Sequence, residues 1–208
     1  MAFTVGNTIV ASDVNVLGLL IYFRPNKVGA FVDLGHVQNP QRTIDQQELD
    51  IQSARTGRLL TVKKLTTSLS KGLTFESMSS TETSVLELHR GSSAAGSTAL
   101  GTFVAEDVTP TEGDLLIVQR NAETGGPIRV EYRPSCQIKG TDEQSGDGES
   151  VALLNFEVTV LADENYTIPA TLDGNETAAP LGFVGVVAED DLENVLDIIA
   201  ASGEGEGE

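Results

Sequence analysis

The stretch "GRLLTVKKLTTSLSKGLTFESMSSTETSVLELHRG", residues 57–91, joins a long alternating segment to a short helical one. Between Leu65 and Phe75, the odd-numbered positions are mostly apolar and the even-numbered positions are small and polar. Because successive side chains of a strand point to opposite faces, this pattern predicts a long strand over residues 59–78. One face of that strand would pack on a core and the other would meet water.

The second half of the stretch predicts a short helix over residues 79–91. Ser79 and Glu82 have the spacing of a capping box, and Gly91 suits the C-terminal cap. Val85 and Leu88 lie one turn apart, so we expect them to dock this helix on the sheet.

Short apolar and alternating runs on both sides of this stretch predict further strands and a mainly β protein. Two pairs of runs read as hairpins, and one run near the C-terminal third reads as a single long strand. In order, the runs cover residues 17–25 with 29–37, 114–121 with 126–134, and 151–163.

Residues 38–58, "QNPQRTIDQQELDIQSARTGR", are polar and nearly without apolar periodicity. They predict an extended polar loop. A loop this long inside a compact domain is uncommon and usually has a function, although a surface loop without one is the alternative.

Charge is distributed unevenly along the 208 residues, whose formal net charge is −18. All 13 basic side chains lie within residues 24–139, whereas residues 140–208 hold 17 of the 31 acidic ones. A segment without Lys or Arg cannot bind nucleic acid by neutralising phosphates, and it would repel DNA. Solubility, or adaptation to a salty medium, would explain the same composition.

The acidic part of the chain contains one further helical pattern, over residues 189–202. Its apolar residues form one stripe, and acidic residues stand at its N-terminus. The last six residues, "GEGEGE" (203–208), predict a disordered tail. The stripe consists of Leu192, Val195, Leu196 and Ile199.

Catalytic and metal-binding patterns are missing from the sequence. Cys136 is the single cysteine, and His36 and His89 lie far from it along the chain, so we expect Cys136 to be a small residue at a strand end. No glycine loop precedes a helix in the manner of a phosphate site, and no Cys or His pairs have zinc spacing. We therefore expect no enzyme activity, no cofactor and no metal.

The order of these segments resembles that of the tail tube proteins, or major tail proteins, of long-tailed bacteriophages. The likeness is clear over residues 33–91, "DLGHVQNPQRTIDQQELDIQSARTGRLLTVKKLTTSLSKGLTFESMSSTETSVLELHRG". In that family an "xLGxV" strand precedes a polar loop and a basic "G-x-x-x-x-V-K" restart. A β ribbon and a helix of the "S-x-x-x-x-x-x-L" kind follow.

The resemblance implies a β-sandwich of the tail-tube type over residues 1–163, with the short helix packed on its sheet. Residues 164–202 would be an acidic C-terminal extension that contains the helix. In the family, six subunits form a ring whose inner strands join into a barrel, and stacked rings form the tube. Such a virion protein would assemble in the host cytoplasm with itself, the tape-measure protein, and the tail terminator and tip proteins. DNA would pass through the channel during genome ejection without specific binding, and no membrane would be involved.

Two sets of residues follow from this implied assembly. The loop would reach the next stacked ring, and the polar strand faces would line a net negative channel, with Lys71 on the opposite face of its strand. A decoration or adhesion β-domain on a capsid or tail tip is the alternative function. The predicted inter-ring residues are Arg42, Asp45, Glu48, Arg55 and Arg58, and the predicted lumen-facing residues are Thr66, Ser68, Ser70, Thr74, Asn155, Glu157 and Thr159.

Overall fold

A computed structural model describes residues 18–53, 60–91, 94–98, 101–107, 109–120, 126–146 and 151–202. The strands are β1 (Leu19–Pro25), β2 (Val32–Asp33), β3 (Val37–Ser53), β4 (Leu60–Ser77), β5 (Ala94–Thr98), β6 (Gly101–Val104), β7 (Thr111–Gln119), β8 (Ile128–Gln144), β9 (Leu153–Val160), β10 (Thr167–Ile168), β11 (Thr177–Ala178) and β12 (Phe183–Val187). The helices are α1 (Thr83–Arg90), α2 (Ala170–Asp173), the 3₁₀ helix η2 (Glu189–Asp191) and α3 (Leu192–Ser202).

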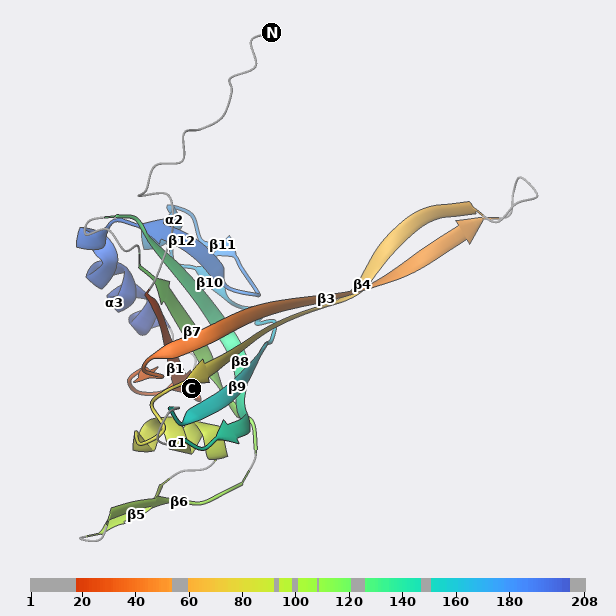
Figure 1. Cartoon of the computed structure of the whole chain (residues 1–208). Coiled ribbons are helices and arrows are strands. Elements are labelled where there is room, and N and C mark those ends of the chain that lie inside the picture. The colour runs from red at the N-terminus through yellow and green to blue at the C-terminus, as the bar shows by residue number, and fades with distance from the viewer. Residues whose placement is uncertain are drawn as a thin grey trace.

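One large antiparallel sheet organises the molecule, in the order β2-β1-β7-β8-β9-β4-β3, with β12 also paired to β8 (Figure 1). The prediction of a mainly β protein with a short helix on the sheet and a C-terminal helix is confirmed. Of the two predicted hairpins, β1 pairs with β2 only through Tyr22 and Phe23, while β7 and β8 pair over most of their length.

Two hydrophobic cores lie on opposite faces of this sheet. The first core lies under α1 and contains Phe23, Phe75 and Phe156. The second core lies under α3 and contains Val130 and Tyr132. β8 has a bulge between Arg133 and Cys136, because Leu115 pairs with Arg133 while Gly113 pairs with Cys136. The extra residue reverses which face the even-numbered side chains of β8 occupy, so one strand contributes to both cores.

The strand and helix predicted from residues 59–91 are confirmed as β4 and α1. Leu73 and Phe75 of β4 are buried, as are Val85 and Leu88 of α1. Gly91 ends the helix with a left-handed φ of 69°, which suits glycine.

The predicted capping box is wrong. Glu82, not Ser79, occupies the N-cap position of α1, and it makes no side-chain cap hydrogen bond. The carbonyl of Ser79 instead accepts a hydrogen bond from the Glu82 amide, which closes a turn before the helix begins.

The prediction of a loop over residues 38–58 is wrong for residues 38–53, which belong to β3; residues 54–58 lie outside the described part of the chain. Residues 41–50 are exposed, so β3 has no core to bury and needs no apolar alternation. Its backbone pairs with β4 from Val37 to Ser53, which supplies the hydrogen bonds that a strand requires.

The C-terminal helical pattern is confirmed as α3, preceded by η2. Leu192 and Ile199 are buried, and Val195 and Leu196 pack against the second core. Because β12 also pairs with β8, this acidic part of the chain is built onto the sheet.

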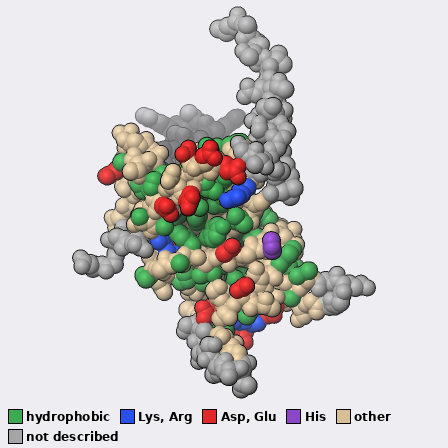
Figure 2. All heavy atoms as spheres, turned by 90° about the vertical axis from the view of Figure 1, so that its left-hand side faces the viewer, with side chains coloured by type: hydrophobic (Ala, Val, Ile, Leu, Met, Phe, Trp, Pro, Cys, Tyr) green, Lys and Arg blue, Asp and Glu red, His purple; other side chains and the backbone are tan. Residues whose placement is uncertain are grey.

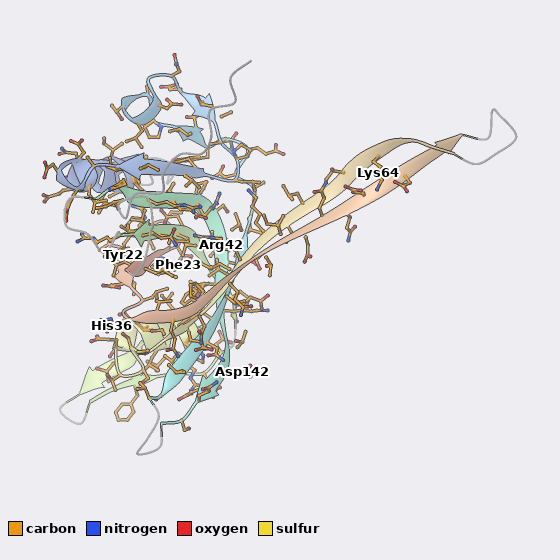
Figure 3. All side chains as sticks on the ribbon, turned by 45° about the horizontal axis from the view of Figure 1, so that its top comes forward. Tyr22, Phe23, His36, Arg42, Lys64 and Asp142 are labelled. Carbon is orange, nitrogen blue, oxygen red and sulfur yellow. The ribbon has the colours of Figure 1, made fainter. Side chains whose placement is uncertain are left out.

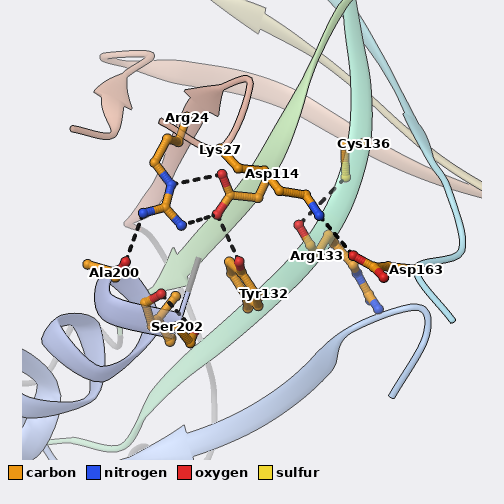
Figure 4. A network of polar contacts seen from close by, with 10 residues as sticks. Arg24, Lys27, Asp114, Tyr132, Arg133, Cys136, Asp163, Ala200 and Ser202 are labelled. Atoms are coloured by element: carbon orange, nitrogen blue, oxygen red, sulfur yellow. Dashed lines mark hydrogen bonds and ion pairs between the residues drawn. The ribbon is translucent and has the colours of Figure 1, made fainter. Parts of the chain in front are cut away.

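A buried polar network connects β1, β7, β8 and α3 (Figure 4). Arg24 donates to both carboxylate oxygens of Asp114, at 3.0 and 2.7 Å, and the Tyr132 hydroxyl donates to the same carboxylate at 2.8 Å. Arg24 also donates to the carbonyl of Ala200, near the end of α3, at 2.8 Å. Burial of the ring, followed by the charge of Asp114, raises the pKa of Tyr132, so its hydroxyl stays a donor.

Cys136 lies in the middle of β8, not at a strand end as predicted, and it is fully buried in the first core. Burial raises the pKa of its thiol to about 12. Because the thiolate is the reactive form of cysteine, this thiol is held in its unreactive form.

His89 gives the fold a testable pH dependence. Its ring packs edge-to-face on Phe156, with the centroids 5.3 Å apart, and burial lowers its pKa below the ordinary 6.5. Well above pH 6.5 the imidazole is neutral in both the folded and the unfolded chain. Between pH 6.5 and the lower pKa of the folded chain, the unfolded chain binds a proton that the folded chain does not, so acidification favours unfolding across this window.

We therefore expect the free energy of unfolding, measured by urea denaturation, to fall more between pH 7.5 and 5.5 in the wild type than in a His89→Gln variant. Uptake of one proton on unfolding limits the difference to about 1.4 kcal/mol per pH unit. Parallel pH dependences of the two proteins would show that His89 is not protonated preferentially in the unfolded state.

Candidate assembly surfaces

A long β hairpin projects from the body of the molecule (Figure 1). β4 pairs with β9 only from Lys71 to Ser77, whereas its pairing with β3 continues to Leu60. Within the described residues, residues 44–53 of β3 therefore pair only with β4, and residues 60–70 of β4 pair only with β3. We call these residues the arm.

Both edges of the arm lack a partner strand within the described residues. β3 ends the sheet order, and β9 stops opposite Lys71, before the arm begins. Each edge presents a row of backbone N–H and C=O groups that another chain can pair with. A long exposed edge is a liability for a monomer, so these two edges are candidate joining surfaces.

The side chains of the arm combine exposed apolar and charged groups. Ile44, Leu49 and Leu69 are 65%, 55% and 47% exposed. The ammonium group of Lys64 lies 3.1 Å from a carboxylate oxygen of Glu48, in an exposed pair that water and salt screen. Ile44 and Leu69 share one face of the arm, and neighbouring exposed apolar side chains suit a surface that becomes covered on assembly.

The base of the arm is fixed to the body by Arg42 (Figure 3). Its guanidinium donates to Glu131 on β8 at 2.8 Å, and the Glu131 side chain is buried. Arg42, predicted as an inter-ring residue, thus has a partner in its own chain. Asp45 and Glu48 are exposed on the arm, while Arg55 and Arg58 lie outside the described residues.

Five of the seven residues predicted to face the lumen share one face of the sheet, which we call the polar face. Thr74 pairs directly with Glu157, and the pairing continues through β4 and β9 on either side. Directly paired residues point to the same face. The five residues are Ser70, Thr74, Asn155, Glu157 and Thr159.

Thr66 does not share this face with Ser70. Ser70 pairs with Asp45 and Thr66 pairs with Glu48, and these two β3 positions point to opposite faces. The register shift between Gln47 and Glu48 leaves an extra residue in β4, which reverses its parity. The side chain of Ser68 lies outside the described set.

Sequence reasoning missed the neighbours that β7 and β8 add to the polar face. Lys139 pairs with Glu157 across the ladder, and its ammonium group lies 2.8 Å from the carboxylate. Gln137 is likewise next to Glu112, its amide donating at 2.9 Å. The parity of residues 126–134 does not continue into this part of β8, because the bulge intervenes. Lys71, in contrast, pairs with Val160 on the face of the first core, as strand parity predicts.

Neither a metal centre nor a membrane span stands out in the parts of the chain that the structure describes. Among those residues, no three His, Cys, Asp or Glu side chains are grouped so as to hold a metal ion. No helix formed by them has the length and apolar character needed to cross a bilayer.

No protein-family model and no curated protein matches this sequence. Solved structures with a partial likeness to this one include the following two. One is the tail of an empty GTA particle with C6 symmetry, at 11% identity and a TM-score of 0.40, covering 70% of this chain and 92% of that chain. The other is the six-fold symmetrised baseplate of the anti-feeding prophage, at 14% identity and a TM-score of 0.40, covering 67% of this chain and 86% of that chain.

Proposed function

We infer that this protein is a structural virion subunit that polymerises through its arm into stacked hexameric rings and so forms a phage tail tube. The observation that carries this proposal is the arm, whose two edges lack a partner strand within the described residues. The resemblance over residues 33–91 supplies the ring of six and the channel that serves the tape-measure protein and DNA.

The length of the arm fits assembly better than it fits a lone domain. A projecting two-stranded ribbon buries little apolar surface of its own and is marginally stable in water. Pairing its edges with neighbouring subunits satisfies the open backbone groups and covers Ile44, Leu49 and Leu69. The arm also carries the predicted inter-ring residues Asp45 and Glu48, so we propose that it contacts the next ring as well.

The polar face is the surface we propose for the channel wall. Its side chains are short or acidic, and Lys139 is held in an ion pair by Glu157. A DNA strand in transit would meet few cations able to bind phosphate, and each cation bound would add affinity by counterion release.

Electron microscopy of the concentrated, purified protein tests the proposal. We expect rings or tubes with six-fold end views. Discrete trimers at all concentrations would instead support the decoration or adhesion domain, and monomers at all concentrations would contradict the tube.

The channel wall gives a second expected result. Replacing Glu157 with lysine removes the partner of Lys139 and adds a cation to every subunit of the ring, so DNA ejection should slow, most strongly at low salt. Ejection is measured from virions that carry the variant, with Glu164→Lys as the charge-matched control, because Glu164 is exposed and belongs to none of the strands that form the polar face. Equal ejection rates for the two variants at low salt would place the polar face away from the channel.

A further inference from the structure

A cavity of about 190 Å³ lies between the base of the arm and β8, on the sheet face that carries the first core. Its apolar wall includes Leu73, Ile117 and Val160. Four basic side chains also line it, from three different strands: Arg42, Lys71, Arg129 and Arg133. We call it the basic cavity.

The basic cavity contains more positive charge than its own carboxylate can balance. Glu131 accepts from Arg42 at 2.8 Å and from Arg133 at 3.1 and 2.6 Å, and the Arg129 guanidinium lies 3.6 Å away. One carboxylate therefore faces three guanidinium groups and the ammonium group of Lys71. Among the described residues the buried Nε of Arg129 has no hydrogen-bond partner, which leaves a donor in the cavity unsatisfied.

Exposed apolar side chains flank the basic cavity on two sides. On the arm side, Ile44 pairs with Lys71 and Leu69 pairs with Gln46, so both apolar residues lie on the cavity face. On the β8 side, Val184 pairs with Glu131 and Val186 with Arg129. Val184 and Val186 are 47% and 73% exposed. A polar centre with an apolar surround of this kind is suited to contact with another protein surface.

The complementary charge lies on α3, across the sheet from the basic cavity. Leu192 and Ile199 pack α3 on the second core. Glu193 and Asp197 are exposed and lie one helical turn apart. Figure 2 views the molecule from the side of α3 and shows acidic side chains gathered over the upper part of the molecule. Like charges four residues apart disfavour the helix slightly, a cost that a basic partner would remove.

We propose that the basic cavity of one subunit receives Glu193 and Asp197 of a second copy of this chain. Glu193 and Asp197 supply two carboxylates to a site with an excess of positive charge, and the surrounding apolar residues exclude water from the contact. This proposal rests on the self-assembly inferred above and names one of its contacts.

The placement of the two surfaces determines the kind of assembly. The basic cavity and α3 lie on opposite faces of the sheet, so one copy cannot fill its own cavity. A contact between two different patches is head-to-tail, and head-to-tail contacts generate closed rings or helical filaments. The contact is therefore compatible with a ring of six.

Charge exchange tests the contact. The cavity variant carries Lys71→Glu and Arg129→Glu, and the helix variant carries Glu193→Lys and Asp197→Lys. Each alone should weaken self-association at least about 100-fold, because like charges then meet at the contact. Arg120→Glu is the control for charge reversal, since Arg120 is exposed and lies outside the cavity.

An equimolar mixture of the two variants should associate again. Each reversed cavity then finds a reversed helix, and each native cavity a native helix, which an even-numbered ring satisfies throughout. Sedimentation velocity measures the association and electron microscopy the particle shape. The recovery also shows that both variants are folded.

The outcomes separate this contact from the proposed function. Wild-type rings that persist in both variants would overturn the contact and leave the tube proposal standing. Oligomers other than rings that are lost in each variant and regained in the mixture would support the contact and contradict the tube. A wild-type chain that stays monomeric would overturn both.

Discussion

Replacing Asp114 with alanine is expected to lower the free energy of unfolding by about 3–5 kcal/mol. Arg24 and Asp114 are 1% and 0% exposed, so the variant leaves a buried guanidinium without its counter-ion. The Tyr132 hydroxyl loses its acceptor at the same time. Urea denaturation at neutral pH, followed by circular dichroism, measures the change as a shift in midpoint at constant slope.

Asp163→Ala is the matched control for this experiment. Asp163 pairs with Lys27 at 2.8 Å, but the two side chains are 13% and 29% exposed, so its loss should cost no more than about 1 kcal/mol. Equal losses of unfolding free energy in the two variants would show that Asp114 stabilises the fold no more than a partly exposed ion pair does. Because Arg24 also reaches Ala200, the Asp114 variant should also loosen α3 and expose amide hydrogens there to exchange.

Removing the arm is expected to abolish assembly while the body stays folded. Asp45 and Ser70 pair directly, so residues 46–69 can be replaced by an Asn-Gly turn that closes the shortened hairpin. The deletion removes no side chain of either core, and the melting temperature should change by only a few degrees. Self-association should fall at least about 100-fold, because the edge hydrogen bonds and the apolar contacts are lost together.

Lys64→Ala is the control within the arm. It removes the exposed pairs with Glu48 and Asp50 but leaves the ribbon intact, so assembly should weaken only slightly. Sedimentation velocity compares the two variants. A deletion variant that associates as tightly as the Lys64 variant would exclude the arm as the joining element.

The long strands β4 and β9, each with a buried face, could be predicted from the sequence, whereas β3, without one, could not. Leu73, Phe75 and Phe156 alternate with polar residues because one side of β4 and β9 covers the first core. β3 has no such side, and its polar sequence is indistinguishable by pattern from that of a loop. The hydrogen bonds that make it a strand come from β4, a partner that periodicity does not reveal.

Bulges account for most of the differences at the candidate surfaces. The register shift next to Glu48 turns Thr66 away from the face of Ser70, and the one after Arg133 brings Lys139 beside Glu157. Each inserts a single residue. Pro134 stands in the β8 bulge, where proline is tolerated within a sheet, but no comparable residue marks the shift next to Glu48. The basic cavity was also beyond sequence reasoning, since Arg42, Lys71 and Arg129 are brought together only by the crossing of the arm base over β8.

Cryo-electron microscopy of the assembled wild-type protein tests most directly whether the arm joins the subunits. We expect rings of six in which the edges of the arm pair with strands of neighbouring subunits and the polar face lines the channel. Assemblies in which the arms make no contact with other subunits, or in which the polar face is turned to the outside, would contradict the proposed function.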